Sequence, residues 1–130
     1  MPARLKSAYM LLVHLPSNHR IRVGKLGEIS FKKGIYLYVG SGGKTPLKRI
    51  QRHATKKKRC FWHIDFLTSI GEVIGAVMVE SRKNLECELS RMLEPCFPSI
   101  KGFGCSDCSC KSHLFYLVEK TKKEEKDEKP

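Results

Sequence analysis

The stretch Ile35-Tyr36-Leu37-Tyr38-Val39-Gly40-Ser41-Gly42-Gly43 and the segment Pro46-Leu47-Lys48-Arg49-Ile50-Gln51-Arg52-His53 decide the fold. Aromatic and β-branched residues dominate the first stretch up to residue 39, which predicts a strand that the glycines close. Thr45 is a favoured N-cap residue, and Pro46 can occupy the first helical position because its missing N–H would have no partner there. We therefore expect a strand over 35–39, a glycine turn and a helix over about 46–56 in direct succession.

The same region is strongly basic. Residues 29–64 contain ten lysines and arginines and no acid, within a chain whose formal net charge is +12. Residues 120–130 hold five lysines against four acids, so the positive charge belongs to the rest of the chain. The field of such a domain attracts anionic partners. The sequence favours nucleic acid over an acidic lipid surface, because no amphipathic basic helix stands apart from the expected core.

A chain of 130 residues suffices for one domain with a buried core, which we expect at residues 1–119. Residues 120–130 form a charged tail with too little apolar surface to order itself. The longest N-terminal apolar run, at residues 8–13, is too short for a membrane span or a secretory signal. We therefore expect a cytoplasmic protein with no membrane partner, in which cysteines are more often thiols or metal ligands than disulfides.

The remaining strands and helices follow from the same propensities. Two short β-rich segments with Gly24 and Gly27 between them predict a hairpin. Apolar residues at 85, 89, 92 and 93 form a helical stripe. In a short helix at 61–67 we expect Trp62 in the core, and His63 and Asp65 in structural rather than catalytic roles. The expected set comprises strands at 9–14, 20–23, 28–31, 72–79 and 113–118, and helices at 61–67 and 85–93.

The helix at 46–56 carries side chains that can act on a phosphodiester. Its apolar stripe consists of Leu47, Ile50 and Ala54. His53 borders the groove between this helix and the sheet, and Arg49 is long enough to reach back toward it, whereas Arg52 points outward. The alternative interpretation is that Arg49 and His53 belong only to a solvated basic face.

Three tyrosines lie on the predicted strands. Tyr36 and Tyr38 alternate and therefore point to the same side of their strand. Tyr9 shares its face with Leu11 and Val13. Composition alone favours a packing role for all three, so a functional role requires a more specific pattern.

That pattern is the combination of the tyrosine strand, the glycine turn, the Arg–His helix and the later segment Leu85-Glu86-Cys87-Glu88-Leu89. It resembles the GIY-YIG nuclease superfamily over roughly residues 7–93, most specifically over 34–53. Within the superfamily the chain looks most like a compact subgroup of poorly characterised stand-alone domains, which share the segments at 61–67 and 102–108.

The literal Gly34-Ile35-Tyr36 is not the first motif of this superfamily. Its members place two tyrosine motifs on separate adjacent strands, and a single residue separates Tyr36 from Tyr38. We assign the first motif to Ser7-Ala8-Tyr9 and the second to Tyr38-Val39-Gly40. Ser-Ala replaces the usual Gly-Ile, and the unusually long connection is expected to hold an extra hairpin. The fold expected is α/β, with a small, mainly antiparallel central sheet flanked by helices.

The resemblance implies a metal-dependent endonuclease that hydrolyses DNA phosphodiester bonds with one Mg²⁺ or Mn²⁺ ion. DNA repair and branched DNA are the settings that it implies. By this analogy Glu86 holds the metal, and Glu88 is an alternative that helical periodicity does not exclude.

The same analogy gives roles to four other side chains. Tyr9 orients or deprotonates the attacking water, and Tyr38 assists. Arg49 contacts the scissile phosphate, and His53 positions water or the leaving group. A phenol with its ordinary pKa near about 10 is a poor base at neutral pH, so Arg49 and the metal would have to lower the pKa of Tyr9.

A non-catalytic nucleic-acid-binding module of the same fold is the main alternative, and a zinc-organised RNA-binding protein is a weaker one. In each case a basic surface would follow the phosphate backbone without reading sequence. A solvated helix end is the plain alternative for these cations. The residues expected on this surface are Lys44, Lys48, Arg52 and Lys56.

The cysteine-rich loop is a candidate zinc site. Its potential ligands are Cys105, Cys108, Cys110 and His113. The spacing contains one zinc-like pair, but four ligands within nine residues are cramped, and secure zinc sites draw ligand pairs from separated segments. Zinc, disulfides and thiols in a tight loop all stay open.

Overall fold

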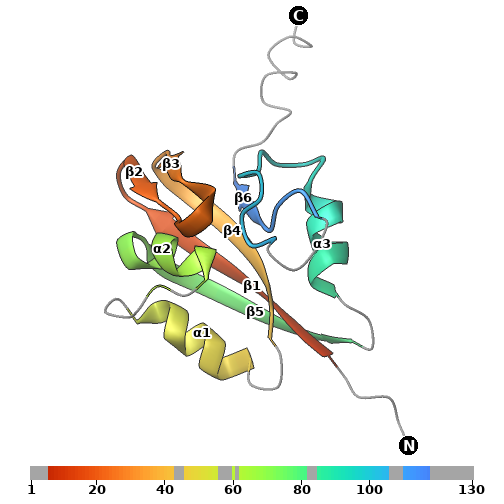
Figure 1. The fold of residues 1–130 in the computed structure, drawn as a ribbon. Helices are drawn as coiled ribbons and strands as arrows, with labels where there is room; N and C mark the ends of the chain where they lie inside the picture. Colours follow the sequence, from red (N-terminus) through yellow and green to blue (C-terminus); the bar gives the residue numbers. More distant parts are fainter. Residues whose placement is uncertain are drawn as a thin grey trace, which may run out of the picture.

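Four antiparallel strands form the central sheet in the order β5-β1-β4-β6 (Figure 1). The computed structural model describes residues 6–42, 46–55, 60, 62–81, 85–105 and 110–117. The strands are β1 (Lys6–Leu15), β4 (Gly34–Ser41), β5 (Glu72–Ser81) and β6 (Leu114–Tyr116). With the helices that flank this sheet, the expected α/β fold class is confirmed.

A two-stranded sheet is inserted between β1 and β4 along the chain. It pairs β2 (His19–Arg22) with β3 (Glu28–Phe31), which the short 3-10 turn η1 (Gly24–Leu26) connects. Gly27 has a φ of 80°, a left-handed conformation that favours glycine, and its N–H bonds to the Gly24 carbonyl. The extra hairpin expected between the two motif strands is therefore present.

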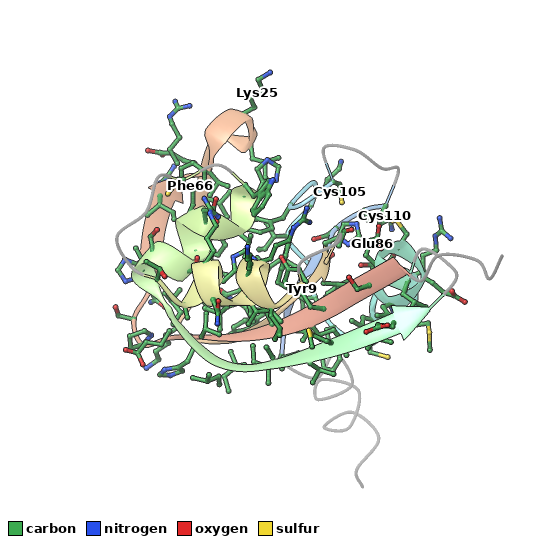
Figure 2. All side chains as sticks on the ribbon, turned by 90° about the horizontal axis from the view of Figure 1, so that it is seen from below. Tyr9, Lys25, Phe66, Glu86, Cys105 and Cys110 are labelled. Atoms are coloured by element: carbon green, nitrogen blue, oxygen red, sulfur yellow. The ribbon has the colours of Figure 1, made fainter. Side chains whose placement is uncertain are left out.

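Helices α1 (Pro46–Ala54) and α2 (His63–Ile70) lie on one side of β1 and β5, while α3 (Leu85–Leu93) packs against β1 and β4 (Figures 1 and 2). The carboxylate of Asp65 explains where α2 begins, because its Oδ2 accepts the Trp62 N–H at 2.7 Å and caps the first turn. Within the described ranges, no helix combines the length and apolar composition needed to cross a lipid bilayer.

The core lies between the sheet and these helices. Alternate residues of β1, among them Leu11 and Val13, are fully buried, because successive side chains of a strand point to opposite faces. They pack in one cluster with Ile64 and Leu67 of α2 and with Phe103 of the loop before β6. The buried face of β1 is also the face that carries Tyr9.

Helix α1 presents a different side to the sheet from the one that its apolar residues predict. Leu47 is 61% exposed and Ala54 is exposed, so the expected stripe is wrong at both positions. Ile50 packs against the core, and His53 is only 1% exposed. The reason is polar, since His53 forms a buried hydrogen bond with Tyr9 on β1 that an outward rotation of α1 would break.

Candidate active site

Tyr9 and Tyr38 meet over Gly40 on neighbouring strands. Tyr9 pairs with Gly40 in the β1–β4 ladder, and Tyr38 lies two residues earlier on β4, so both phenols emerge on the same face. Their ring centroids are 6.1 Å apart. A Cβ at Gly40 would lie 2.6 Å from Tyr9 Cζ and 2.8 Å from Tyr38 Cε2, so glycine is what leaves room for both rings.

His53 reaches this tyrosine pair from α1. Its Nε2 lies 2.6 Å from the Tyr9 hydroxyl, and its ring centroid is 6.4 Å from that of Tyr38. On the other side of the imidazole, Nδ1 lies 3.8 Å from Oδ1 of Asp65. A carboxylate beside Nδ1 favours the proton on that nitrogen and leaves Nε2 as the acceptor for the phenol. A proton can thus move between Tyr9 and His53 along their hydrogen bond, while the nearby Asp65 carboxylate stabilises positive charge on the imidazole.

Asp65 also holds α2 against α1. Its fully buried carboxylate forms an ion pair with Nη1 of Arg52. The outward direction expected for Arg52 is therefore wrong, because this ion pair draws the guanidinium toward α2. Spacing along the chain did not predict this role of Asp65 as an anchor. The available signal was that Asp65 is the first acid after the acid-free stretch 29–64.

Trp62 lies against two guanidinium groups rather than in the core. Cζ of Arg49 is 5.2 Å and Cζ of Arg52 is 4.9 Å from its ring centroid, a cation–π arrangement. The indole is 39% exposed, so the expected core position is wrong. Arg49 Nη1 also donates to the Ser41 carbonyl at the end of β4. These contacts hold the Arg49 guanidinium near both phenols, where its positive charge lowers the pKa of Tyr9 and of Tyr38.

Burial raises the pKa of both phenols. For Tyr9 desolvation is the largest cause, and the charges of Arg49 and Arg52 lower the pKa only in part. For Tyr38, desolvation and then the neighbouring Tyr9 raise the pKa. The prediction of a lowered pKa for Tyr9 is therefore wrong as far as the side chains of this protein are concerned. Both phenols stay protonated at neutral pH.

Glu86 approaches the sheet from α3. Its side chain is partly buried whereas Glu88 is exposed, so the fold favours Glu86 as the inward acid. Burial lowers the pKa of His113, and the charge of Glu86 raises it. The backbone carbonyl of His113 accepts the Val39 N–H at 2.9 Å, one residue from Tyr38. Glu86 thus belongs to a second group of side chains, around His113, that borders the tyrosine pair.

The donor chemistry at Glu86 suits Mg²⁺ or Mn²⁺. These hard cations prefer oxygen ligands, and Mg²⁺ in particular often binds through one or two carboxylates together with substrate phosphates and waters. A single partly buried carboxylate therefore fits an ion whose remaining ligands are waters and the oxygens of a substrate phosphate. Cys87, the next residue on α3, offers a soft thiolate that suits zinc instead.

Three residues form a potential metal-binding group of that softer kind. The ligand atoms of Cys87, Cys110 and His113 all lie within 4.8 Å of one another. This group differs from the predicted loop site, because Cys105 takes no part in it and its thiol instead donates to the Phe103 carbonyl at 3.5 Å. Cys108 lies outside the described residues. Cysteine spacing did not predict Cys87 as a ligand, because this residue comes from α3 rather than from the cysteine-rich loop.

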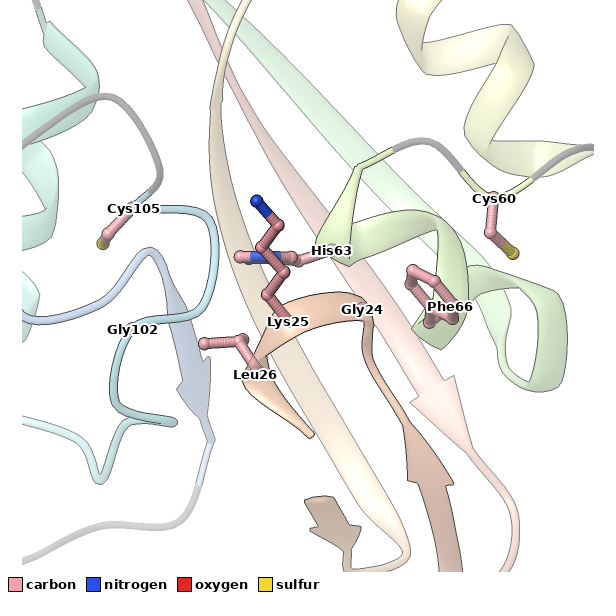
Figure 3. Close-up of a pocket in the computed structure, with 8 residues that line it drawn as sticks. All are labelled: Gly24, Lys25, Leu26, Cys60, His63, Phe66, Gly102 and Cys105. Atoms are coloured by element: carbon pink, nitrogen blue, oxygen red, sulfur yellow. The ribbon is translucent and has the colours of Figure 1, made fainter. Parts of the chain in front are cut away.

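A pocket of about 650 Å³ opens between η1, α2 and the loop at 102–105 (Figure 3). Nδ1 of His63 accepts the Gly104 N–H at 2.8 Å, which is a structural role as expected. A Cβ at Gly104 would lie 3.1 Å from Tyr38 Cε1, so this loop separates the pocket from the tyrosine pair. The lining residues are Gly24, Lys25, Leu26, Cys60, His63, Phe66, Gly102 and Cys105.

The residues expected to contact the phosphate backbone have different surroundings. Lys48 is exposed on α1, whereas Arg52 is engaged with Asp65. Lys44 and Lys56 lie outside the described residues, as do the expected domain boundary at 119 and the tail at 120–130.

A family model described as a domain of unknown function, DUF123, matches residues 8–129 of the chain. No curated protein and no solved structure matches the sequence. The matched range includes both the tyrosine pair and the cysteine–histidine group.

Proposed function

We propose that this chain, which belongs to the DUF123 family of domains of unknown function, is a metal-dependent endonuclease that hydrolyses DNA phosphodiester bonds. The observation that carries the proposal is a cluster of polar side chains from three elements, most of them buried. Its members are Tyr9, Tyr38, Arg49 and His53. Titratable groups with shifted pKa values gather preferentially at functional sites. DNA repair and branched DNA are the settings suggested by the resemblance to the GIY-YIG nucleases.

Tyr9 and His53 together act as the base in this proposal. The attacking water gives a proton to the Tyr9 oxygen as the phenol proton passes to His53 Nε2, 2.6 Å away. The Asp65 carboxylate, 3.8 Å from Nδ1, stabilises the imidazolium that forms. The raised pKa of Tyr9 is then no obstacle, because the phenol never carries a full negative charge.

Arg49 binds the scissile phosphate. One of its nitrogens donates to the Ser41 carbonyl, and its planar fork has further N–H groups for phosphoryl oxygens. When bound at Glu86, Mg²⁺ or Mn²⁺ supplies Lewis-acid stabilisation of the charge that develops on the phosphoryl group. The deprotonated water forms a new P–O bond, the ester P–O bond breaks, and the leaving oxygen takes a proton from solvent.

Cations around the cluster would guide the DNA. Lys48 is exposed on α1, and Lys25 lines the pocket beside the Gly104 loop. Contacts of this kind neutralise phosphates and give binding that weakens as salt rises. They carry no base readout, so we expect recognition of DNA shape rather than sequence.

Incubation of the purified protein with supercoiled, single-stranded and branched DNA in Mg²⁺ or Mn²⁺ tests the proposal. We expect cleavage of at least one substrate, abolished by Arg49→Ala and by Glu86→Ala. The matched controls are Arg20→Ala, in an exposed ion pair of the hairpin, and Glu88→Ala on the exposed side of α3; both should keep cutting. Cleavage that survives Arg49→Ala contradicts the proposal.

A non-catalytic nucleic-acid-binding module is the second candidate. The burial of both phenols favours it, because a buried tyrosine is also an ordinary packing residue. Salt-sensitive DNA binding by a folded protein that cuts none of the three substrates with either metal is the result expected for this module.

A further inference from the structure

Two segments that are distant in sequence meet at the first turn of α3. Cys87 lies in that turn, and Cys110 and His113 precede β6. Their ligand atoms lie within 4.8 Å of one another. In a tetrahedral zinc site, with Zn–S of about 2.3 Å and Zn–N of about 2.0 Å, neighbouring ligand atoms are about 3.5–3.8 Å apart. The three side chains therefore need only a small contraction to close around an ion.

Ser90 links the first turn of α3 to the imidazole of His113. Ser90 Oγ donates to the Glu86 carbonyl at 2.7 Å and lies 2.8 Å from His113 Nδ1. When Ser90 donates its single hydroxyl proton to the Glu86 carbonyl, His113 Nδ1 donates to Ser90 and the imidazole lone pair lies on Nε2, the tautomer that the zinc site requires. Metal-binding histidines usually donate their second ring N–H in this way, which fixes the ring and the ligand nitrogen.

We propose that Cys87, Cys110 and His113 bind one zinc ion. Two thiolates and an imidazole form a soft donor set that selects zinc over Mg²⁺, and three protein ligands with a further ligand or water complete four-coordination. Cys60 and Cys96 lie outside the group, so the site is a specific grouping of part of the chain's cysteines.

Zinc at this site ties α3 to the segment that enters β6. His113 directly precedes β6, which pairs with β4 as far as Tyr38. Glu86 directly precedes Cys87 on α3, so the ion fixes the helix turn that carries Glu86 beside the strand that carries Tyr38. Its effect on cleavage rests on the proposed function, whereas zinc binding itself does not.

Zinc content of the purified full-length chain, measured by atomic spectroscopy after reconstitution with zinc, tests the site directly. We expect one zinc per chain, retained by Cys105→Ser and Cys96→Ser and lost in Cys87→Ser and Cys110→Ser. The Cys87→Ser and Cys105→Ser pair is decisive, because the loop site expected from sequence spacing predicts the opposite pattern. Circular dichroism of each variant separates loss of zinc from loss of fold.

Cobalt provides a second readout that does not depend on cleavage. We expect Co²⁺ to give the thiolate-to-metal absorption and visible bands of a tetrahedral site, with weaker thiolate absorption in Cys87→Ser. Ser90→Ala should weaken zinc binding about 10–100-fold in a chelator competition, because His113 loses its orienting partner, while Ser90→Thr restores it.

Three results would overturn the site. They are a wild-type chain that takes up no stoichiometric zinc or cobalt, a folded Cys87→Ser variant with full zinc, and a Cys105→Ser variant that loses it. If zinc binds as expected but no DNA is cut, the zinc site stands and the proposed nuclease function fails.

Discussion

The tyrosine group and the cysteine–histidine group border each other on the same sheet but are held together differently. Tyr9, His53 and Asp65 are joined by a hydrogen bond and close charges that the chain supplies by itself. The ligand atoms of Cys87, Cys110 and His113 lie within 4.8 Å of one another, and the proposed zinc ion would join them. The difference teaches that hydrogen bonds and charges already organise the tyrosine group, whereas the proposed zinc would add a further link within the cysteine–histidine group. Substitutions in the tyrosine group should therefore leave zinc binding intact.

The largest effect is expected for Tyr9→Phe. Loss of the hydroxyl removes the proton route to His53, which should lower kcat for DNA cleavage about 10²–10⁴-fold. Tyr36→Phe is the matched control, since Tyr36 is equally buried but donates to the Lys32 carbonyl. Zinc content should stay the same in both variants. Cleavage by Tyr9→Phe at the wild-type rate would show that Tyr9 is a packing residue.

Gly40→Ala should disturb the tyrosine group through packing. Its new Cβ would overlap both phenol rings, so unfolding in urea should show a loss of about 1–3 kcal/mol, and cleavage should fall. Gly75→Ala on β5 is the control, because its Cβ would meet Leu12 Cδ1 at an ordinary 3.5 Å. Equal stability of the two variants would mean that the rings are not confined over Gly40.

Asp65→Asn should weaken the contact between α1 and α2. It removes the charge that pairs with Arg52 and orients His53, and we expect a loss of about 1.5–3 kcal/mol in urea unfolding together with slower cleavage. Glu28→Gln breaks the exposed pair with Arg20 and should cost about 0–1 kcal/mol. An equal loss of stability in Asp65→Asn and Glu28→Gln would contradict the role of Asp65 as a buried anchor.

Alkaline pH should destabilise the fold through Tyr36. Burial raises the pKa of Tyr36 to about 12 from 10.0, so the folded state keeps this proton at a pH where the unfolded chain has lost it. The resulting stability is complete below about pH 10 and is lost as pH rises toward about 12. Urea unfolding across this range should show a decline that is shallower in Tyr36→Phe. If the free energy of unfolding declines with pH as steeply in Tyr36→Phe as in the wild type, Tyr36 does not cause the decline.

Local sequence signals predicted most of the fold. The strand and the helix after residue 34 and the hairpin around Gly27 lie where the sequence indicated, because each depends on neighbouring residues. The expected end of the strand at residue 39 is wrong, since β4 continues through Gly40 to Ser41. The motif assignment also selected Tyr9 and Tyr38, which do meet. Periodicity failed on α1, where it placed Leu47 inward and Arg52 outward, since it ignores a hydrogen bond to another element.

The sequence by itself determined a basic α/β domain, the order of its elements, and an arginine and a histidine one helical turn apart. Only the tertiary structure decided that His53 faces Tyr9, 44 residues away, and that Cys87 of α3, rather than Cys105, groups with Cys110 and His113. The physical reason is that turns and helices are set by near neighbours. A polar site between elements depends on how those elements pack, and spacing along the chain does not encode that.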